Sequence, residues 1–283
     1  MFNLPKLNIP QTCRIIEEFL KTRLEEARLK GYVIGLSGGL DSTTSVTILV
    51  RAIGADKVKG YFLPTTTTPE KDLNDVEEIC KKLHIILHQI DVQPLLDKFS
   101  QQIALSIDSR TPEWSNLKAR FRQAIWYFFA NQANYLVCGN GNKSELMIGY
   151  YTKFGDGAAD VLPLGDIYKT HVIELAKYLE VPEAIINKPP SAGLWKNQTD
   201  EEEIGMTYEL LDKILFLLEH FHKPQEISEV LEIPLEQVYK VKKLIYQSEH
   251  KRRGPIILKL GVRISGLDWK MPLTSSSSRL KTR

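Results

Sequence analysis

A short apolar run that ends in a glycine-rich turn is the feature that most restricts the fold of this 283-residue chain. Tyr32-Val-Ile-Gly-Leu36 has the length and composition of a buried strand, and the turn Ser37-Gly-Gly39 follows it directly. A helical pattern over 42–53 comes next and stops at Gly54. A buried strand that passes through a tight glycine turn into a helix is the first half of a βαβ unit, so we expect a parallel sheet with crossover helices.

The rest of the chain repeats this alternation and then abandons it. Further apolar runs over 58–63, 85–90 and 135–139 are separated by helical patterns, which predicts an α/β fold: a doubly wound parallel sheet with helices on both faces. After Gly165 the pattern is helical only, which predicts a C-terminal helical subdomain. We expect helices over 11–30, 42–53, 72–83, 116–131, 170–179, 201–222, 225–231 and 235–248.

The charge distribution separates a body from a tail. The chain has 37 Lys and Arg against 35 Asp and Glu, but residues 250–283 hold nine of the bases and one acid. The balanced total favours neither a nucleic-acid coat protein nor a membrane-surface protein. We expect one domain over 1–255, with an α/β core at about 11–180 and a helical part at about 198–250. A basic, partly flexible C-terminal tail over 256–283 follows, with a Ser-rich stretch at 274–279.

Cysteine usage and hydropathy predict the compartment. Cys13, Cys80 and Cys138 are far apart and form no CxxC pair, which argues against a disulfide framework and a cysteine-based zinc site. The N-terminal residues lack a cationic segment followed by an apolar one, and the longest apolar run, 124–130, is too short to span a bilayer. We expect a cytoplasmic protein that binds no membrane.

The glycine-rich turn has the chemistry of a phosphate site. Gly38 and Gly39 allow close backbone approach, while Ser37 and Ser42 offer hydroxyl groups. The start of the following helix adds unpaired N–H groups and a positive dipole end. Asp41 lies inside this cradle and would repel a phosphate unless a divalent cation joined them, so magnesium is the expected cofactor.

Two common nucleotide motifs do not account for this turn. No lysine follows Gly39 as a Walker A loop requires, and the GxGxxG spacing of dinucleotide folds is absent. An ordinary strand-to-helix turn capped by Ser or Asp is the alternative. The segment Ser37-Gly-Gly-Leu-Asp-Ser42 nevertheless resembles the signature SGGxDS of the N-type ATP pyrophosphatases, which cleave ATP between its α and β phosphates.

Later motifs narrow the resemblance to one family. In order along the chain these are Gly139-Asn-Gly-Asn-Lys-Ser-Glu145, Thr152-Lys-Phe-Gly-Asp-Gly-Ala-Ala-Asp160, Pro190-Ser-Ala-Gly-Leu-Trp195 and Ser248-Glu-His-Lys-Arg252. The series, from about residue 11 to 255, resembles the ammonia-dependent NAD synthetases, which amidate nicotinic acid adenine dinucleotide (deamido-NAD). The second and third motifs are far more specific than the glycine turn alone.

This resemblance implies a set of site residues. It assigns Mg²⁺ to Asp41 and Glu145, and catalysis to Asp41 and Lys169. It implies ATP binding, with ATP as co-substrate, by Gly35, Leu36, Ser37, Gly38, Gly39, Asp41, Ser42, Asn140, Lys169 and Ser191. It implies deamido-NAD binding by Arg120, Lys153, Asp156, Asp160, His250 and Lys251.

Three of these assignments differ from the family pattern or leave a choice between residues. Arg122 lies on the same helix as Arg120, and the sequence leaves open which arginine contacts the substrate. Asn140 and Ser191 stand where many bacterial members of the family have threonine, and both keep the capacity to hydrogen-bond.

The implied reaction has two steps. The nicotinate carboxylate attacks the α-phosphorus of ATP and releases pyrophosphate, and ammonia then displaces AMP. No glutaminase motif surrounds Cys13, so free ammonia is the expected donor, with a separate glutaminase subunit left open. The resemblance also implies a homodimer, and the segment 124–130 is either its surface or part of the core.

Three other functions compete with this interpretation. A tRNA-thiolating relative usually carries extra cysteine pairs, which this chain lacks. A DNA-binding regulator is suggested by the helix-turn-helix spacing of 226–245, but its second helix begins Leu235-Glu-Gln237, an acidic start poorly suited to DNA. We therefore expect small-molecule substrates and no nucleic-acid partner. A silent nucleotide sensor would not need Asp41, Glu145 and Lys169 together.

Overall fold

A computed structural model gives the structure of residues 2–108, 110–195, 198–265 and 268–270. The Ser-rich stretch at 274–279 lies outside these residues. A four-stranded parallel sheet in the order β3-β2-β1-β4 forms the centre. Its strands are β1 (Tyr32–Leu36), β2 (Val58–Phe62), β3 (Ile86–Gln89) and β4 (Leu136–Cys138). The α/β prediction is confirmed, and each strand lies within two residues of its expected bounds.

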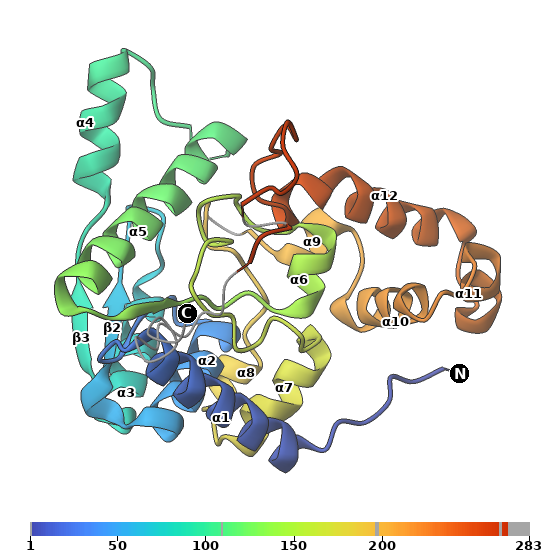
Figure 1. The fold of residues 1–283 in the computed structure, drawn as a ribbon, viewed down its shortest axis with the longest axis horizontal. Helices are drawn as coiled ribbons and strands as arrows, with labels where there is room; N and C mark the ends of the chain where they lie inside the picture. Colours follow the sequence, from blue (N-terminus) through green and yellow to red (C-terminus); the bar gives the residue numbers. More distant parts are fainter. Residues whose placement is uncertain (1, 109, 196–197, 266–267, 271–283) are drawn as a thin grey trace.

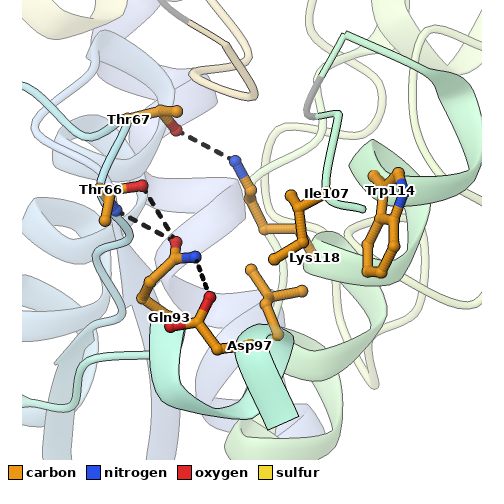
Figure 2. Close-up of a pocket in the computed structure, with 8 residues that line it drawn as sticks. Thr66, Thr67, Gln93, Asp97, Ile107, Trp114 and Lys118 are labelled. Carbon is orange, nitrogen blue, oxygen red and sulfur yellow. Dashed lines mark hydrogen bonds between the residues drawn. The ribbon is translucent and has the colours of Figure 1, made fainter. Parts of the chain in front are cut away.

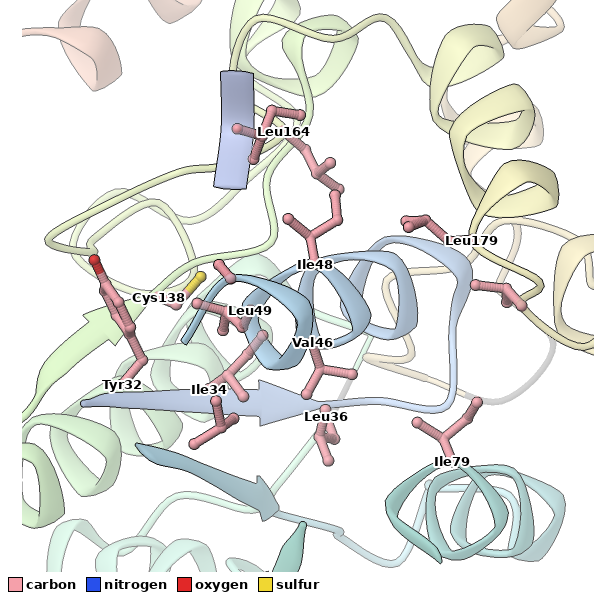
Figure 3. Packing of buried hydrophobic residues seen from close by; sticks show 14 of the residues in the cluster. Tyr32, Ile34, Leu36, Val46, Ile48, Leu49, Ile79, Cys138, Leu164 and Leu179 are labelled. Atoms are coloured by element: carbon pink, nitrogen blue, oxygen red, sulfur yellow. The ribbon is translucent and has the colours of Figure 1, made fainter. Parts of the chain in front are cut away.

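Helices cover both faces of the sheet because side chains of β1 alternate between them. Tyr32, Ile34 and Leu36 belong to one buried cluster, whereas Val33 belongs to another. Figure 3 shows β1 lying beneath α2, with Ile34 and Leu36 against the helix. The first face carries α1 (Ile9–Ala27), α2 (Leu40–Ile53), α3 (Glu70–Leu83), α7 (Lys169–Tyr178) and α8 (Glu183–Ile186). The second face carries α4 (Gln93–Ile103) and α5 (Pro112–Ala133).

The remaining helices form a third buried cluster at one end of the sheet, on the right in Figure 1. They are α6 (Lys143–Ile148), α9 (Asp200–Ile204), α10 (Tyr208–Glu219), α11 (Pro224–Leu231) and α12 (Leu235–Arg252). The 3₁₀ turn η1 (Ala55–Lys57) precedes β2. This cluster confirms the C-terminal helical part, and no described helix is long and apolar enough to cross a membrane.

The single helix expected over 201–222 is wrong. The chain forms α9 and α10 instead, separated at Gly205, whose φ of 75° ends α9 in the left-handed region. Thr207 then caps α10 by accepting the Leu210 N–H at 3.4 Å. Helix α4 was not expected at all, although Leu96, Phe99 and Ile103 have helical spacing. The split places Asp200 at the start of its own short helix, which matters for the site.

The sheet order places the site. The chain adds β2 and then β3 on one side of β1, and it then crosses back to add β4 on the other side, so the strand order reverses between β1 and β4. In open α/β sheets such a reversal point opens a crevice at the carboxyl edge, where ligands bind. The glycine turn after β1 and the segment after β4 that carries Glu145 both lie at this edge.

Candidate active site

The turn after β1 is held in shape by its own serines and by α3. Gly38 has φ of 72°, and a Cβ at this position would lie 2.7 Å from the Asp72 carbonyl oxygen. The Ser42 hydroxyl accepts the Ser37 N–H at 3.2 Å and donates to the Gly39 carbonyl at 3.1 Å. The N-cap of α2 is Gly39, which has no side chain with which to cap the helix, so the positive end of the helix dipole is open at the carboxyl edge of the sheet. This is the geometry of an anion cradle.

Asp41 and Lys169 form an ion pair between the starts of α2 and α7. The Lys169 ammonium donates to Asp41 Oδ2, and the lysine side chain is only 4% exposed. Burial opposes the charge of Lys169, but the carboxylates of Asp41 and Glu145 outweigh it and raise the pKa of the lysine above its usual value. The two residues that the sequence assigned to catalysis are therefore in direct contact, 128 positions apart.

Glu145 lies in the first turn of α6 and joins this cluster through Asn142. The Glu145 N–H donates to Asn142 Oδ1 at 3.0 Å, and its carboxylate accepts the Asn142 N–H at 3.1 Å. The other end of the Asn142 side chain donates to Asp41 Oδ1 at 3.3 Å. Burial and the charge of Asp41 raise the pKa of Glu145 well above its usual value. The two carboxylates therefore repel each other electrostatically, and a cation shared between them would relieve this repulsion.

The donor set fits magnesium. No group of three or more His, Cys, Asp and Glu side chains in the described part of the chain is arranged to hold a metal. Asp41 and Glu145 alone supply two hard oxygen donors beside an anion cradle. Mg²⁺ is usually held by one or two carboxylates together with substrate phosphates and waters, rather than by an all-protein cage. Lys169 neutralises one of the two carboxylates, which leaves one negative charge for a cation to balance.

Sequence reasoning missed a third carboxylate near the ion pair. Asp200 is buried at the start of α9 and accepts hydrogen bonds from the hydroxyls of Tyr150 at 3.1 Å and Tyr208 at 3.3 Å. The Lys169 ammonium lies over the Tyr208 ring, 5.4 Å from its centre. Burial raises the pKa of Asp200, while Lys169 opposes that shift. From sequence, Asp200 is one acid in the run Asp-Glu-Glu-Glu, and only the fold distinguishes it.

Sequence reasoning also missed the role of Lys188. Its ammonium donates to the Gly38 carbonyl at 3.1 Å, to Asp72 at 2.5 Å and to Asp75 at 3.0 Å. One side chain therefore ties the glycine turn to α3 and to the segment that leads to Ser191. Ser191 itself accepts the Gly193 N–H at 3.1 Å on an exposed stretch. In the sequence, Lys188 is a lysine that precedes two prolines, and this pattern does not indicate the contact with the glycine turn.

Asn140 contacts the same turn. Its Nδ2 donates to the Gly35 carbonyl at 2.8 Å, at the end of β1. Its Oδ1 is buried and accepts no hydrogen bond from the residues that the structure describes. An acceptor without a donor at the carboxyl edge suits a ligand N–H or hydroxyl group.

The residues expected to bind the dinucleotide gather around the loop that follows α6. Lys153 donates to the His250 carbonyl at 2.6 Å and accepts on its own carbonyl from Arg120 at 3.3 Å. Lys251 donates to two carbonyls of this loop at 2.6 Å, and Asp156 accepts the Thr152 N–H at 2.9 Å. α12 is thereby fastened to the loop by its last turn.

Asp160 hydrogen-bonds to β4 and to α5. Its carboxylate accepts the Val137 N–H of β4 at 2.7 Å and the Tyr127 hydroxyl at 3.4 Å. Arg122 also points elsewhere, donating to the Leu63 carbonyl after β2 at 2.9 Å, and burial lowers the pKa of its guanidinium to about 10. Arg120 thus hydrogen-bonds to the loop of Lys153, whereas Arg122 interacts electrostatically with Asp156 of the same loop.

A cavity of about 330 Å³ lies beside this edge, between the loop after β2 and helices α4 and α5. Figure 2 shows Lys118 reaching toward Thr67, and Gln93 bonded to both Thr66 and Asp97. Lys118 is 3% exposed and donates to Thr67 Oγ1 at 3.0 Å and to the Leu194 carbonyl at 2.7 Å. Burial, helped by Arg122, lowers its pKa to about 8. None of the sequence-assigned site residues lines this cavity.

Comparisons with known proteins agree on one family. Residues 12–255 match the family model described as NAD synthase. The NH₃-dependent NAD⁺ synthetase of Sulfurisphaera tokodaii is 40% identical over 269 residues, which cover 94% of this chain and 95% of that relative. The enzyme of the same name from Methanocaldococcus jannaschii is 44% identical over 245 residues, which cover 85% and 93%.

Solved structures give the same result for the fold. The NMN synthetase from Francisella tularensis superposes with a TM-score of 0.80 at 31% identity, covering 90% of this chain and all of that one. The NH₃-dependent NAD synthetase from Campylobacter jejuni, in complex with the nitrate ion, has a TM-score of 0.75 at 27% identity, covering 89% and 100%.

Proposed function

The chain belongs to the NAD synthase family, and on that premise we propose that it is an ATP-dependent ligase that joins ammonia to the nicotinate carboxyl group of deamido-NAD and releases NAD. The observation that carries this function is the cluster of Asp41, Lys169 and Glu145 beside an uncapped helix start at the carboxyl edge of the sheet. The cluster has the charges needed to hold a metal-bound triphosphate.

The chemistry requires activation of the acid before amidation. A carboxylate resists ammonia because an oxide ion would have to leave. In the first step a carboxylate oxygen of the nicotinate bonds to the α-phosphorus of ATP, and the bond to the β-phosphate oxygen breaks. Ammonia then bonds to the acyl carbon, AMP leaves with the electron pair of the broken C–O bond, and the extra proton on nitrogen goes to solvent. Positioning of three reactants can supply about 7–11 kcal/mol of such a barrier.

The residues at the edge divide this work. The glycine turn and the Ser37 and Ser42 hydroxyls donate hydrogen bonds to phosphate oxygens, and Lys169 stabilises negative charge as the α-phosphate is attacked. Asp41 and Glu145 would hold Mg²⁺, which when bound offsets polyphosphate charge. Asn140 and Ser191 bind the nucleotide through their polar groups. None of these steps needs a covalent enzyme nucleophile, so the two serines act as donors only.

The dinucleotide is assigned to the loop after α6. Arg120, Lys153 and Lys251 supply positive charge there, and His250 adjoins them on α12. Asp156 and Asp160 complete the proposed set from the same segment. The contact of Arg120 with the Lys153 carbonyl supports Arg120, rather than Arg122, as the substrate-binding arginine.

We further infer a homodimer that works in the cytoplasm on small diffusible substrates. The described cysteines Cys13, Cys80 and Cys138 are all free and buried, in keeping with a reducing compartment. Helix α5 supports the dimer because its segment 124–130 contributes one side to the core and leaves an aromatic side chain exposed, where a second copy could cover it. Ala130 is 1% exposed, whereas Phe128 is 62% exposed.

A reaction with purified protein tests the function. The protein is incubated with ATP, Mg²⁺, ammonium and deamido-NAD, and NAD, AMP and pyrophosphate are quantified. The expected result is equal amounts of all three products. Formation of ADP and phosphate instead, or no NAD, would contradict the proposal.

Two parallel reactions refine the substrates. Glutamine replaces ammonium in the first, and a rate as high as with ammonium would contradict free ammonia as the donor. Nicotinic acid mononucleotide replaces the dinucleotide in the second, because one similar structure is named an NMN synthetase. We expect the dinucleotide to give the higher kcat/KM, since His250 and Lys251 lie with the loop residues that would contact its second nucleotide.

A further inference from the structure

The two carboxylates of the site are joined by one buried side chain, that of Asn142. It is 0% exposed and lies between the first turns of α2 and α6. Its Oδ1 accepts the Glu145 N–H at 3.0 Å, and its Nδ2 donates to Asp41 Oδ1 at 3.3 Å. Because one end of the amide must accept and the other must donate, these two contacts fix the orientation of the group.

The backbone of Asn142 adds a third contact. Its N–H donates to Glu145 Oε2 at 3.1 Å, which completes the capping box of α6. Asp41 Oδ1 and Glu145 Oε2 are therefore both held by the same residue, while Asp41 Oδ2 faces Lys169. Such a residue sets the distance and the direction of both carboxylates at once.

A carboxamide suits this position better than a charged group. Asp41, Glu145 and Asp200 already interact electrostatically with Lys169. A fourth acid would add repulsion, and an apolar side chain would leave Asp41 Oδ1 without this donor. Partners that orient metal ligands typically change metal affinity 10- to 100-fold when they are removed.

We propose that Asn142 is a positioning residue that pre-forms the divalent-cation site by orienting Asp41 and Glu145 toward a shared ion. This inference rests on the proposed assignment of Mg²⁺ to those carboxylates. Asn142 contacts neither substrate nor the reacting atoms in this scheme, and it acts through the two acids. The cap of α6 uses Oδ1 and the backbone N–H of Asn142, whereas the hold on Asp41 uses Nδ2, so substitutions can remove the contact with Asp41 and keep the cap.

Binding of Mn²⁺ tests the inference without turnover. The affinity of the full-length protein for Mn²⁺ is measured by electron paramagnetic resonance in the presence of α,β-methylene-ATP, which cannot be cleaved between its α and β phosphates. Asn142→Ser keeps an N-cap oxygen but loses the donor to Asp41. We expect its Mn²⁺ dissociation constant to rise at least about tenfold while its melting temperature stays near that of the wild type.

Two further variants separate capping from positioning. Asn142→Ala loses both contacts, so we expect a lower melting temperature together with the same loss of Mn²⁺ affinity. Asn8 caps α1 by accepting the Gln11 N–H at 3.2 Å, outside the site. Asn8→Ala should lower the melting temperature and leave Mn²⁺ affinity unchanged. In steady-state assays, Asn142→Ser should raise the half-saturating Mg²⁺ concentration by the same factor as the Mn²⁺ constant, with kcat at saturating Mg²⁺ largely kept.

The outcomes distinguish this inference from the metal assignment. Wild-type Mn²⁺ affinity in Asn142→Ser, with a loss of affinity in Asp41→Asn, overturns the positioning role and keeps the metal site. Wild-type affinity in both variants overturns the metal site, and the inference falls with it. A tenfold loss in Asn8→Ala would show that any weakened cap lowers affinity, which also overturns the proposal.

Discussion

A single ammonium holds several acids together at the active edge. Lys169 is paired with Asp41, lies over the Tyr208 ring and interacts electrostatically with Glu145 and Asp200. Buried acids are costly unless they are paired, so this lysine stabilises the fold as well as serving the proposed chemistry. Each member of the cluster therefore has two consequences when it is replaced.

Asp41→Asn tests the consequence for the proposed chemistry. The amide keeps the size of the side chain but gives up the charge that attracts the metal, so we expect adenylation to fall by about a thousandfold or more, the several kcal/mol that a metal supplies. Pyrophosphate–ATP exchange in the presence of deamido-NAD measures this step. Asp166→Asn is the matched control, because the Asp166 side chain is 93% exposed. Wild-type exchange in Asp41→Asn would refute the metal assignment.

The lowered pKa of buried Lys118 predicts that the stability of the fold depends on pH. Its folded pKa of about 8 lies below the usual 10.5, so the unfolded chain binds more protons between these values and the stability of the fold rises with pH across that window. Below pH 8 both states are protonated and the full cost of burying the charge is present. Lys118→Met removes this dependence. We expect the difference in unfolding free energy between the variant and the wild type to change by roughly 2–3 kcal/mol from pH 7 to pH 10, at about 1.4 kcal/mol per unit.

Urea unfolding of both proteins at the two pH values measures that difference. A difference that stays constant with pH would show that Lys118 titrates normally in the folded state.

At the scale of elements, the glycine turn is shaped by its neighbours more than by its own sequence. The backbone of α3 lies close to Gly38, and Lys188, in the segment after α8, donates a hydrogen bond to the Gly38 carbonyl. The start of α2 is left uncapped, which has a cost for an ordinary helix and a use for one that binds an anion. The turn is therefore a packed junction of three segments.

Gly38→Ala tests that packing. The new Cβ would meet the Asp72 carbonyl at 2.7 Å in a backbone conformation with φ of 72°. We expect a loss of about 3 kcal/mol in unfolding free energy, from left-handed strain and overpacking together, and weaker ATP binding. Gly193→Ala is the matched control, because Gly193 has φ of 62° but no described atom lies within 4 Å of its Cβ position.

The control should lose only about 1 kcal/mol, the strain alone. Chemical denaturation of both variants gives the comparison. Equal losses would mean that the contact with α3 contributes nothing to the turn.

At the scale of the whole molecule, the sequence predicted the architecture and only part of the site. The strands were readable because each is a short apolar run bounded by turn residues, and the family motifs led to Asp41, Glu145 and Lys169, which the fold brings to one edge. The roles assigned to those residues remain predictions. Asp200 and Lys188 were not found, since an acid in an acidic helix turn and a lysine before prolines look solvent-exposed until tertiary packing buries them. The break at Gly205 needed only the glycine itself to be weighed as a helix end.

The exposed aromatic on α5 predicts how two copies meet. Phe128, on α5, is 62% exposed. Sedimentation velocity should show a dimer for the wild type, and Phe128→Lys should shift it toward monomer, because a buried unpaired charge at an interface is costly. Phe221→Lys is the control, since Phe221 is 93% exposed and follows α10, a helix that lies on the right in Figure 1 while α5 lies on the left. A dimer that survives Phe128→Lys would exclude this surface.

The contact between Lys169 and Asp41 has a practical consequence for handling the protein. Because Lys169 already neutralises Asp41, the proposed metal ligand, we expect the folded state to persist in chelator, unlike zinc-dependent domains that unfold when the metal is removed. Preparations treated with EDTA should keep their circular dichroism spectrum and regain full turnover once magnesium is restored. Lys169 balances the charge of Asp41 when no magnesium is bound, so the protein can be stored without metal and supplied with magnesium later.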